Sequence, residues 1–272
     1  MKVSIRTVGT VQLQCHAFVA ARPEAMPHPM AAEILLPPNG DESLRPNAER
    51  TRQLTGAHNQ FVAVTPKRKI LIDASIDSLW LAAGLAQLGF GADDITDVLI
   101  THGDSDHIQG LVTEEGSLRF PNARYLLHSK LWSDWVQDAD EGFYSEEQRQ
   151  AARVLVSQAR DRTQWIVAET EILAGIRAVP SPGHRDSHLA FLLRDGNFGL
   201  LHVGDAFLHQ ILLEDLSRGV VFDTDPEEAI ASRRMLLERA VAERAILFSS
   251  HFPDAGLWRT ESTANGFSYR AA

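Results

Sequence analysis

The chain has 272 residues, of which 44% are hydrophobic and 23% are charged. These proportions are ordinary for a globular protein, so they exclude a disordered, collagen-like or coiled-coil chain. The formal net charge is -10 and the basic residues do not cluster, which argues against a nucleic-acid partner. A single cysteine, Cys15, excludes an internal disulfide and a thiolate-rich metal site. Eleven histidines leave imidazole and carboxylate as the available metal ligands.

The N-terminal segment, residues 1–15, alternates apolar and polar residues and predicts a first strand. Arg6 stands where a signal peptide needs an unbroken apolar stretch. No window approaches the ~20 apolar residues that span a bilayer. We therefore expect a soluble, cytoplasmic protein that does not bind membranes.

Residues 21–58 are rich in proline and polar side chains and show no steady period, which predicts a long loop. Loops of this length inside compact domains tend to be functional. We interpret the segment as a flap over a site or as an arm that embraces a partner subunit, which would make a homodimer. A surface excursion without a role is the open alternative.

Beyond this loop, short apolar strands alternate with helical patterns. Paired strands are expected at 61–65 and 69–73, followed by a helix that Asp77 caps and that ends before Gly89. Further strands are expected at 98–100, 124–127, 176–179 and 245–248, a hairpin at 189–193 and 199–203, and helices at 145–159 and from Pro226 to about Val241. No linker divides the chain, so we expect one α/β domain, residues 1–272, with two similar halves.

Four of the predicted strands end in histidine or aspartate. These ends are the loop from His102 to His107, then His184, Asp205 and His251. Four such coincidences suggest that the strand ends converge on one site. Imidazole suits zinc, iron and other first-row metals, and a carboxylate can bridge two ions, so the pattern predicts a dinuclear site with water in the open positions.

This ordered set resembles the metallo-β-lactamase superfamily, whose first motif is His-x-His-x-Asp-His. The chain reads His102-Gly103-Asp104-Ser105-Asp106-His107, followed by His184, Asp205 and His251. The resemblance implies an α/β (α+β) fold, a four-layer αββα sandwich. Within the superfamily the chain is most similar to the branch of lactonases, esterase-like enzymes and organophosphate hydrolases.

Carried over by position, the resemblance implies two divalent metal ions, zinc first. One ion would be held by His102, Asp104 and His184, the other by Asp106, His107 and His251, with Asp205 bridging them. Asp104 stands where the family usually has histidine, and this hard anionic ligand favours iron or manganese. Asp73 would orient a metal-bound histidine, and His188 would support the ligands or line the pocket. Arg185 could bind an anionic substrate group or simply pair with Asp186.

The leading hypothesis is a metallo-hydrolase that uses a metal-bound hydroxide, positioned by Asp106 and Asp205, on an ester, lactone or phosphoester. The substrate would be a small molecule. One alternative is iron-dependent oxidation, as in persulfide dioxygenases and diiron proteins of the superfamily. Another is a degraded site, marked by Asp104, that is retained for ligand binding.

Overall fold

The computed structural model describes residues 4–19, 57–137, 145–252, 256–264 and 266–272. The chain divides into two compact units, one of residues 1–23 and 59–170 and the other of residues 24–58 and 171–272. The loop expected at 21–58 lies outside the described residues except for its last two positions. That the chain forms a single domain stays a prediction.

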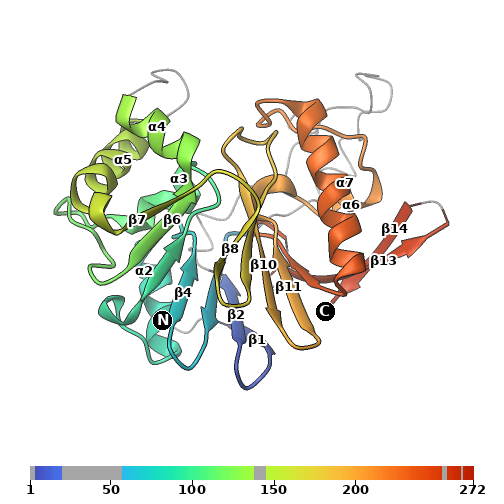
Figure 1. The fold of residues 1–272 in the computed structure, drawn as a ribbon, viewed down its shortest axis with the longest axis horizontal. Helices are drawn as coiled ribbons and strands as arrows, with labels where there is room; N and C mark the ends of the chain where they lie inside the picture. The colour runs from blue at the N-terminus through green and yellow to red at the C-terminus, as the bar shows by residue number, and fades with distance from the viewer. Residues whose placement is uncertain (1–3, 20–56, 138–144, 253–255, 265) are drawn as a thin grey trace. The chain divides into compact units, whose positions relative to one another are not determined.

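The first unit is built on a seven-stranded sheet with the order β1-β2-β3-β4-β5-β6-β7 (Figure 1). Its strands are β1 (Ile5–Gly9), β2 (Gln14–Val19), β3 (Asn59–Val64), β4 (Lys69–Ile72), β5 (Asp97–Leu99), β6 (Arg124–His128) and β7 (Thr163–Ile166). The pairs from β1 to β4 are antiparallel and those from β4 to β7 are parallel. The single N-terminal strand expected from the sequence is therefore wrong. It is a hairpin, because Thr10 N–H and Leu13 O close a turn at 2.8 Å.

The helices of the first unit include the one that was expected to begin after Asp77. They are α2 (Ser78–Gln87), α3 (Ser105–Ile108), α4 (Ser129–Gln137) and α5 (Glu146–Gln158), with short 3-10 turns η5 (Ala92–Asp94), η6 (Gln109–Leu111) and η7 (Arg160–Arg162). The Asp77 carboxylate accepts from the N–H groups of Leu79 and Trp80 in the first turn of α2, and Ser145 with Gln148 forms a capping box on α5. The core beneath them is apolar and fully buried, as at Phe18, Val98 and Tyr125.

The second unit carries a mixed sheet with the order β14-β13-β12-β11-β10-β9-β8. Its strands are β8 (Thr170–Leu173), β9 (Ile176–Pro180), β10 (Leu189–Asp195), β11 (Phe198–His202), β12 (Ile246–Phe248), β13 (Leu257–Thr263) and β14 (Gly266–Ala271). Strands β11 and β12 are parallel, and β9 to β11 and β12 to β14 pair antiparallel. Its helical segments are η8 (Gly204–Ala206), α6 (Ile211–Glu214) and α7 (Pro226–Ala242).

Within each unit, the strands end where the sequence predicts metal ligands. In the first unit β5 leads to His102, and in the second β9, β11 and β12 lead to His184, Asp205 and His251. Helix α7 begins at Pro226 after its Asp225 cap, as expected. Among the residues described here, no helix is long and apolar enough to cross a membrane.

Candidate metal centre

The first unit presents its four candidate ligands on one short segment, the turn after β5 and helix α3. Asp104 occupies the N-cap position of α3, but its side chain makes no capping hydrogen bond. Its Oδ2 lies 3.7 Å from Nε2 of His102, and Asp106 Oδ2 lies 3.6 Å from Nε2 of His107. The centroids of the two imidazole rings are 4.1 Å apart. The segment therefore supplies two adjacent imidazole–carboxylate pairs, as two neighbouring ions require.

Asp73 fixes both histidines of this segment. Its Oδ2 accepts from Nδ1 of His107 at 2.8 Å and from the Thr101 hydroxyl at 2.8 Å, while its Oδ1 accepts from the Thr101 N–H. Since the Thr101 hydroxyl gives its proton to Asp73, its oxygen accepts from Nδ1 of His102, 2.9 Å away. One buried carboxylate thus sets the orientation of two rings, directly for His107 and through a hydroxyl for His102.

Asp73 itself is held in a left-handed backbone conformation, with φ at 59°. The buried amide of Gln60 supports that conformation from β3. Its Nε2 donates to the carbonyls of Ile72 and Asp73 at 2.7 and 2.9 Å, and its Oε1 accepts from Ser75 N–H. Non-glycine residues with positive φ cluster at functional sites, where the surroundings over-determine them. Sequence reasoning missed Gln60, because a lone glutamine on a strand carries no motif.

The ligand segment is also fastened to its neighbours by backbone contacts. Ala74 N–H donates to the carbonyl of His107, and Gly110 N–H donates to the carbonyls of Ala74 and Ser75. A Cβ at Gly110 would meet both of those carbonyl oxygens, so only glycine allows this approach. From α5, Gln148 Nε2 donates to the carbonyl of Gly103 at 3.1 Å.

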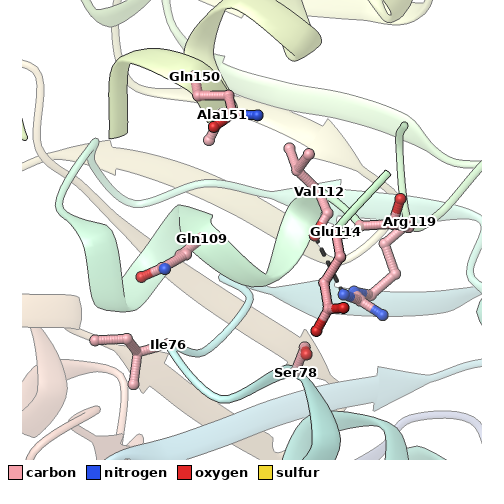
Figure 2. Close-up of a pocket in the computed structure, with 9 residues that line it drawn as sticks. Ile76, Ser78, Gln109, Val112, Glu114, Arg119, Gln150 and Ala151 are labelled. Atoms are coloured by element: carbon pink, nitrogen blue, oxygen red, sulfur yellow. Dashed lines mark hydrogen bonds between the residues drawn. The ribbon is translucent and has the colours of Figure 1, made fainter. Parts of the chain in front are cut away.

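A pocket of about 260 Å³ lies beside η6, the turn that follows His107 and Ile108 (Figure 2). Its lining includes Gln109, Glu114 and Arg119. Arg119 donates from Nε to the carbonyl of Gly110 at 2.8 Å and from Nη2 to that of Val112 at 3.1 Å. Arg119 therefore stabilises this turn.

In the second unit, the Asp205 carboxylate lies between two imidazoles. Its Oδ2 is 3.2 Å from Nε2 of His251 and 3.7 Å from Nε2 of His184, and its Oδ1 is 3.1 Å from Nε2 of His251. All three side chains are buried. Asp205 therefore has carboxylate oxygens close to both imidazoles, and its role as a bridging ligand stays a prediction.

His188 supports Asp205 and is itself neutral. Its Nε2 accepts from the backbone N–H of Asp205 at 3.2 Å, which places the ring proton on Nδ1, 2.8 Å from Oγ of Ser181. His188 therefore contacts a candidate ligand without occupying a ligand position. His202, in contrast, accepts a hydrogen bond from Gly204 N–H, and the centroid of its ring lies 4.6 Å from that of Phe248.

Arg185 donates hydrogen bonds to two backbone carbonyls. Its Nη1 donates at 2.6 Å to the carbonyl of its neighbour His184 and at 2.6 Å to that of Phe222. The guanidinium thus ties the turn after β9 to the segment that precedes α7. Its contribution to substrate binding stays a prediction.

All four candidate histidines form a hydrogen bond through Nδ1. In a neutral ring this leaves the lone pair on Nε2. Nε2 is also the nitrogen that lies near the candidate carboxylates. The Nδ1 partners of His102, His107, His184 and His251 are, in that order, Thr101 Oγ1, Asp73 Oδ2, Asp223 Oδ1 and Ala57 O, at 2.9, 2.8, 3.2 and 2.9 Å. Metal-binding histidines almost always donate their other N–H to a carboxylate, carbonyl or similar partner. In each unit, imidazole nitrogens lie beside carboxylate oxygens, a type of donor that fits first-row divalent cations.

The protein-family profile described as the metallo-beta-lactamase superfamily matches residues 54–251. Among curated proteins, "Probable metallo-hydrolase Rv2300c" of Mycobacterium tuberculosis is 27% identical over 195 residues, which cover 69% of this chain. The match spans only 61% of that relative's length.

Two solved structures share the fold over nearly the whole chain. One is AidC, a dizinc quorum-quenching lactonase in complex with a product, with a TM-score of 0.81, 22% identity, and coverage of 99% of this chain and 98% of AidC. The other is AbOPH, a hydrolase of the beta-lactamase superfamily, with a TM-score of 0.83, 15% identity, and coverage of 100% and 98%. The predicted fold class is confirmed: two mixed sheets with flanking helices match this α/β sandwich. The family profile and the two solved structures thus agree on the fold.

Proposed function

Because the chain belongs to the metallo-β-lactamase superfamily, we propose that it is a dinuclear metal-dependent hydrolase of small molecules with an ester, lactone or phosphoester bond. The observation that carries the proposal is the common anchoring of four histidines through Nδ1. A set of surface or structural histidines has no reason to share one tautomer, whereas metal ligands do. The similarity to AidC supports this substrate class, since AidC is a lactonase and its structure contains an acyl-homoserine product.

In this proposal each unit contributes part of the ligand set. His102, Asp104 and His184 hold one cation, Asp106, His107 and His251 hold the other, and Asp205 bridges the two. The pairing within the first unit supports this division, because each of its histidines lies beside a different carboxylate. In the second unit, the position of Asp205 between His184 and His251 supports the bridging role.

When bound, the cations would lower the pKa of a water molecule to about 7, which supplies a nucleophile, and would polarise the scissile carbonyl or phosphoryl group. Asp106 and Asp205 orient the attacking water and accept its hydrogen bonds. Because these two carboxylates touch imidazole rings that are themselves anchored, they are held in place before substrate arrives.

Zinc is the cation we propose first, with iron or manganese as competitors because of Asp104. A carboxylate is a harder ligand than imidazole and lowers the net charge of its site. For the same reason, iron-dependent oxidation is the second candidate function. Iron in the purified protein together with consumption of oxygen would favour it, and zinc with hydrolysis would exclude it. A cytoplasmic location and a homodimeric state are further parts of the proposal.

The test is hydrolysis by the purified full-length chain of three probes, an N-acyl homoserine lactone, a p-nitrophenyl ester and a phosphotriester, before and after treatment with a chelator. We expect at least one probe to be hydrolysed, activity to disappear with the metal, and zinc, manganese or iron to restore it. Asp134→Asn is a matched control, because Asp134 pairs with Lys130 on α4 and not with the ligands. Hydrolysis that survives complete metal removal would contradict the proposal.

A further inference from the structure

Arg233 is a fully buried arginine in the middle of α7, with a relative exposure of 0%. Arginine is almost never fully buried unless its guanidinium is paired. Here Nη2 donates to Oδ2 of Asp223 at 2.5 Å, Nε donates to the carbonyl of Ala206 at 2.6 Å, and Nη1 donates to the carbonyl of Arg218 at 2.8 Å. One side chain therefore joins α7 to two other segments of the second unit.

Asp223 is the buried partner of this arginine and has two further contacts. Its Oδ2 accepts from Val220 N–H at 3.1 Å, and its Oδ1 accepts from Nδ1 of His184 at 3.2 Å. The Arg233 guanidinium forms an ion pair with the Asp223 carboxylate, and both side chains are fully buried. The carboxylate lies between a fixed cation and the ring of a candidate ligand.

The segment that carries His184 is fastened to the same region. Thr224 N–H donates to the carbonyl of His184, Asp225 N–H donates to that of Gly183, and Ser232 Oγ donates to that of Pro182 at 2.6 Å. The backbone of the turn after β9 thus lies against the start of α7. Within this turn, Asp223 contacts the His184 ring at Nδ1.

We infer that Asp223 and Arg233 are a positioning pair that sets the tautomer and orientation of His184 and holds it in register with Asp205. The link to Asp205 runs through Ala206, whose carbonyl accepts from Arg233 and which directly follows Asp205 in the chain. The inference rests on the proposed function, since it gives the pair a role in cation binding. Arg233 acts through Asp223, and neither touches substrate.

Nothing local in the sequence marks this pair. Asp223 lies 39 residues after His184, and Arg233 lies a further 10 residues along. The contacts form only because α7 returns beside the turn after β9.

The experiment measures zinc affinity, by competition with a chromophoric chelator, for the full chain and for Asp223→Ala, Asp223→Asn, Arg233→Met and the double variant Asp223→Ala/Arg233→Met. We expect Asp223→Ala to weaken zinc binding by about 10- to 100-fold. Asp223→Asn keeps a carbonyl acceptor and should recover part of the loss. The double variant should bind zinc no more weakly than Asp223→Ala alone, because the arginine acts through the aspartate.

Asp97→Asn is the matched control. Asp97 is also a buried carboxylate paired with arginines, Arg68 and Arg124, but it lies at the start of β5, away from the ligand segment. We expect Asp97→Asn to lower stability and leave zinc affinity unchanged. Equal zinc affinity in the wild-type chain and in Asp223→Ala would overturn the inference, as would an equal loss in Asp97→Asn.

A second readout needs no metal. Nitrogen-15 spectra of the histidine rings, with His184→Gln to assign the signal, should show the His184 ring protonated on Nδ1 in the metal-free wild-type chain. In Asp223→Ala this signal should move toward a mixture of tautomers, and in Asp223→Asn it should move less. An unchanged His184 signal would overturn the inference. Absence of any zinc binding by the wild-type chain would instead overturn the proposed function, so the two failures are distinguishable.

Discussion

Asp73 accepts a hydrogen bond from Nδ1 of His107 at 2.8 Å while its own backbone is held at a φ of 59°. For a residue with a Cβ, that conformation costs about 1–2 kcal/mol. The cost is offset by the contacts that the conformation allows, since the same carboxylate also accepts from the N–H and the hydroxyl of Thr101. Local strain thus aims one side chain at the candidate ligand His107 and at Thr101, which in turn contacts His102.

We predict that Asp73→Asn folds but binds divalent cations about 10- to 100-fold more weakly. Asparagine tolerates positive φ, so the backbone survives. Its amide has one acceptor oxygen, however, where the carboxylate uses two for Thr101 and His107. Chelator competition gives the affinity, and circular dichroism checks the fold. Unchanged affinity in a folded variant would show that the His107 orientation does not depend on Asp73.

We predict that Asp104→His shifts metal preference toward zinc. The substitution restores an imidazole where the superfamily's usual motif has one, and it removes a hard anionic ligand beside His102. Protein produced in medium with equal zinc, iron and manganese should show a higher zinc fraction by mass spectrometry of the metals. The same metal ratios in both proteins would show that Asp104 does not set the preference. Turnover that appears only in the variant would favour a degraded site in the native chain.

We predict that Gly183→Ala, in the turn that carries His184, lowers the free energy of unfolding by more than the backbone strain of alanine at positive φ accounts for. Gly183 has a φ of +123°, and a Cβ there would collide with the backbone of Ala229 and lie 2.7 Å from the carbonyl carbon of Glu228. Gly116→Ala is the control, because Gly116 also has positive φ, at +75°, but nothing lies within 4 Å of its added Cβ. Denaturant unfolding should give a loss of about 1–2 kcal/mol for the control and a larger loss for Gly183→Ala. Equal losses would contradict the steric argument.

We predict that the buried thiol of Cys15 makes the protein less stable at high pH. Burial raises the pKa of Cys15 from an ordinary value of 9.0 to about 12. The unfolded chain therefore loses this proton from about pH 9, whereas the folded chain keeps it, so the stabilisation is complete below pH 9 and is lost as the pH rises toward 12.

The loss should approach about 1.4 kcal/mol for each pH unit above 9. Urea unfolding at pH 8 and pH 10 measures it, with Cys15→Ala as the control, because alanine at this position does not titrate. The wild-type chain should lose more stability between the two pH values than the control does. Parallel curves would show that the thiol ionises alike in both states.

The parts of the fold that the sequence predicted have strong local signals. Asp77 caps α2 and Pro226 opens α7 because caps and first-turn prolines act within a few residues. Strands β13 and β14 were missed because most of their side chains are exposed, so their apolar signal is weak. The sequence predicts one strand in place of the N-terminal hairpin, since the turn at 10–13 has no Asn-Gly signal.

The candidate site shows the same difference between residues with a local sequence signal and residues without one. The ligands could be predicted because Asp104, Asp106 and their histidines form a compact motif. Their supports could not, since Gln60 and Arg233 contact Asp73 and Asp223, the partners of candidate ligands, from a strand and a helix that only folding brings near. The resemblance identified Asp73, but nothing in the sequence shows that it acts on His102 through Thr101.

The central claim is that seven histidine and aspartate side chains hold two divalent cations. Anomalous diffraction from crystals of the natively purified protein, recorded on both sides of the zinc, iron and manganese absorption edges, tests it most directly. We predict two peaks, one bounded by His102, Asp104 and His184 and the other by Asp106, His107 and His251, with Asp205 touching both. A single peak, peaks elsewhere, or no anomalous signal in protein that hydrolyses its substrate would contradict the claim.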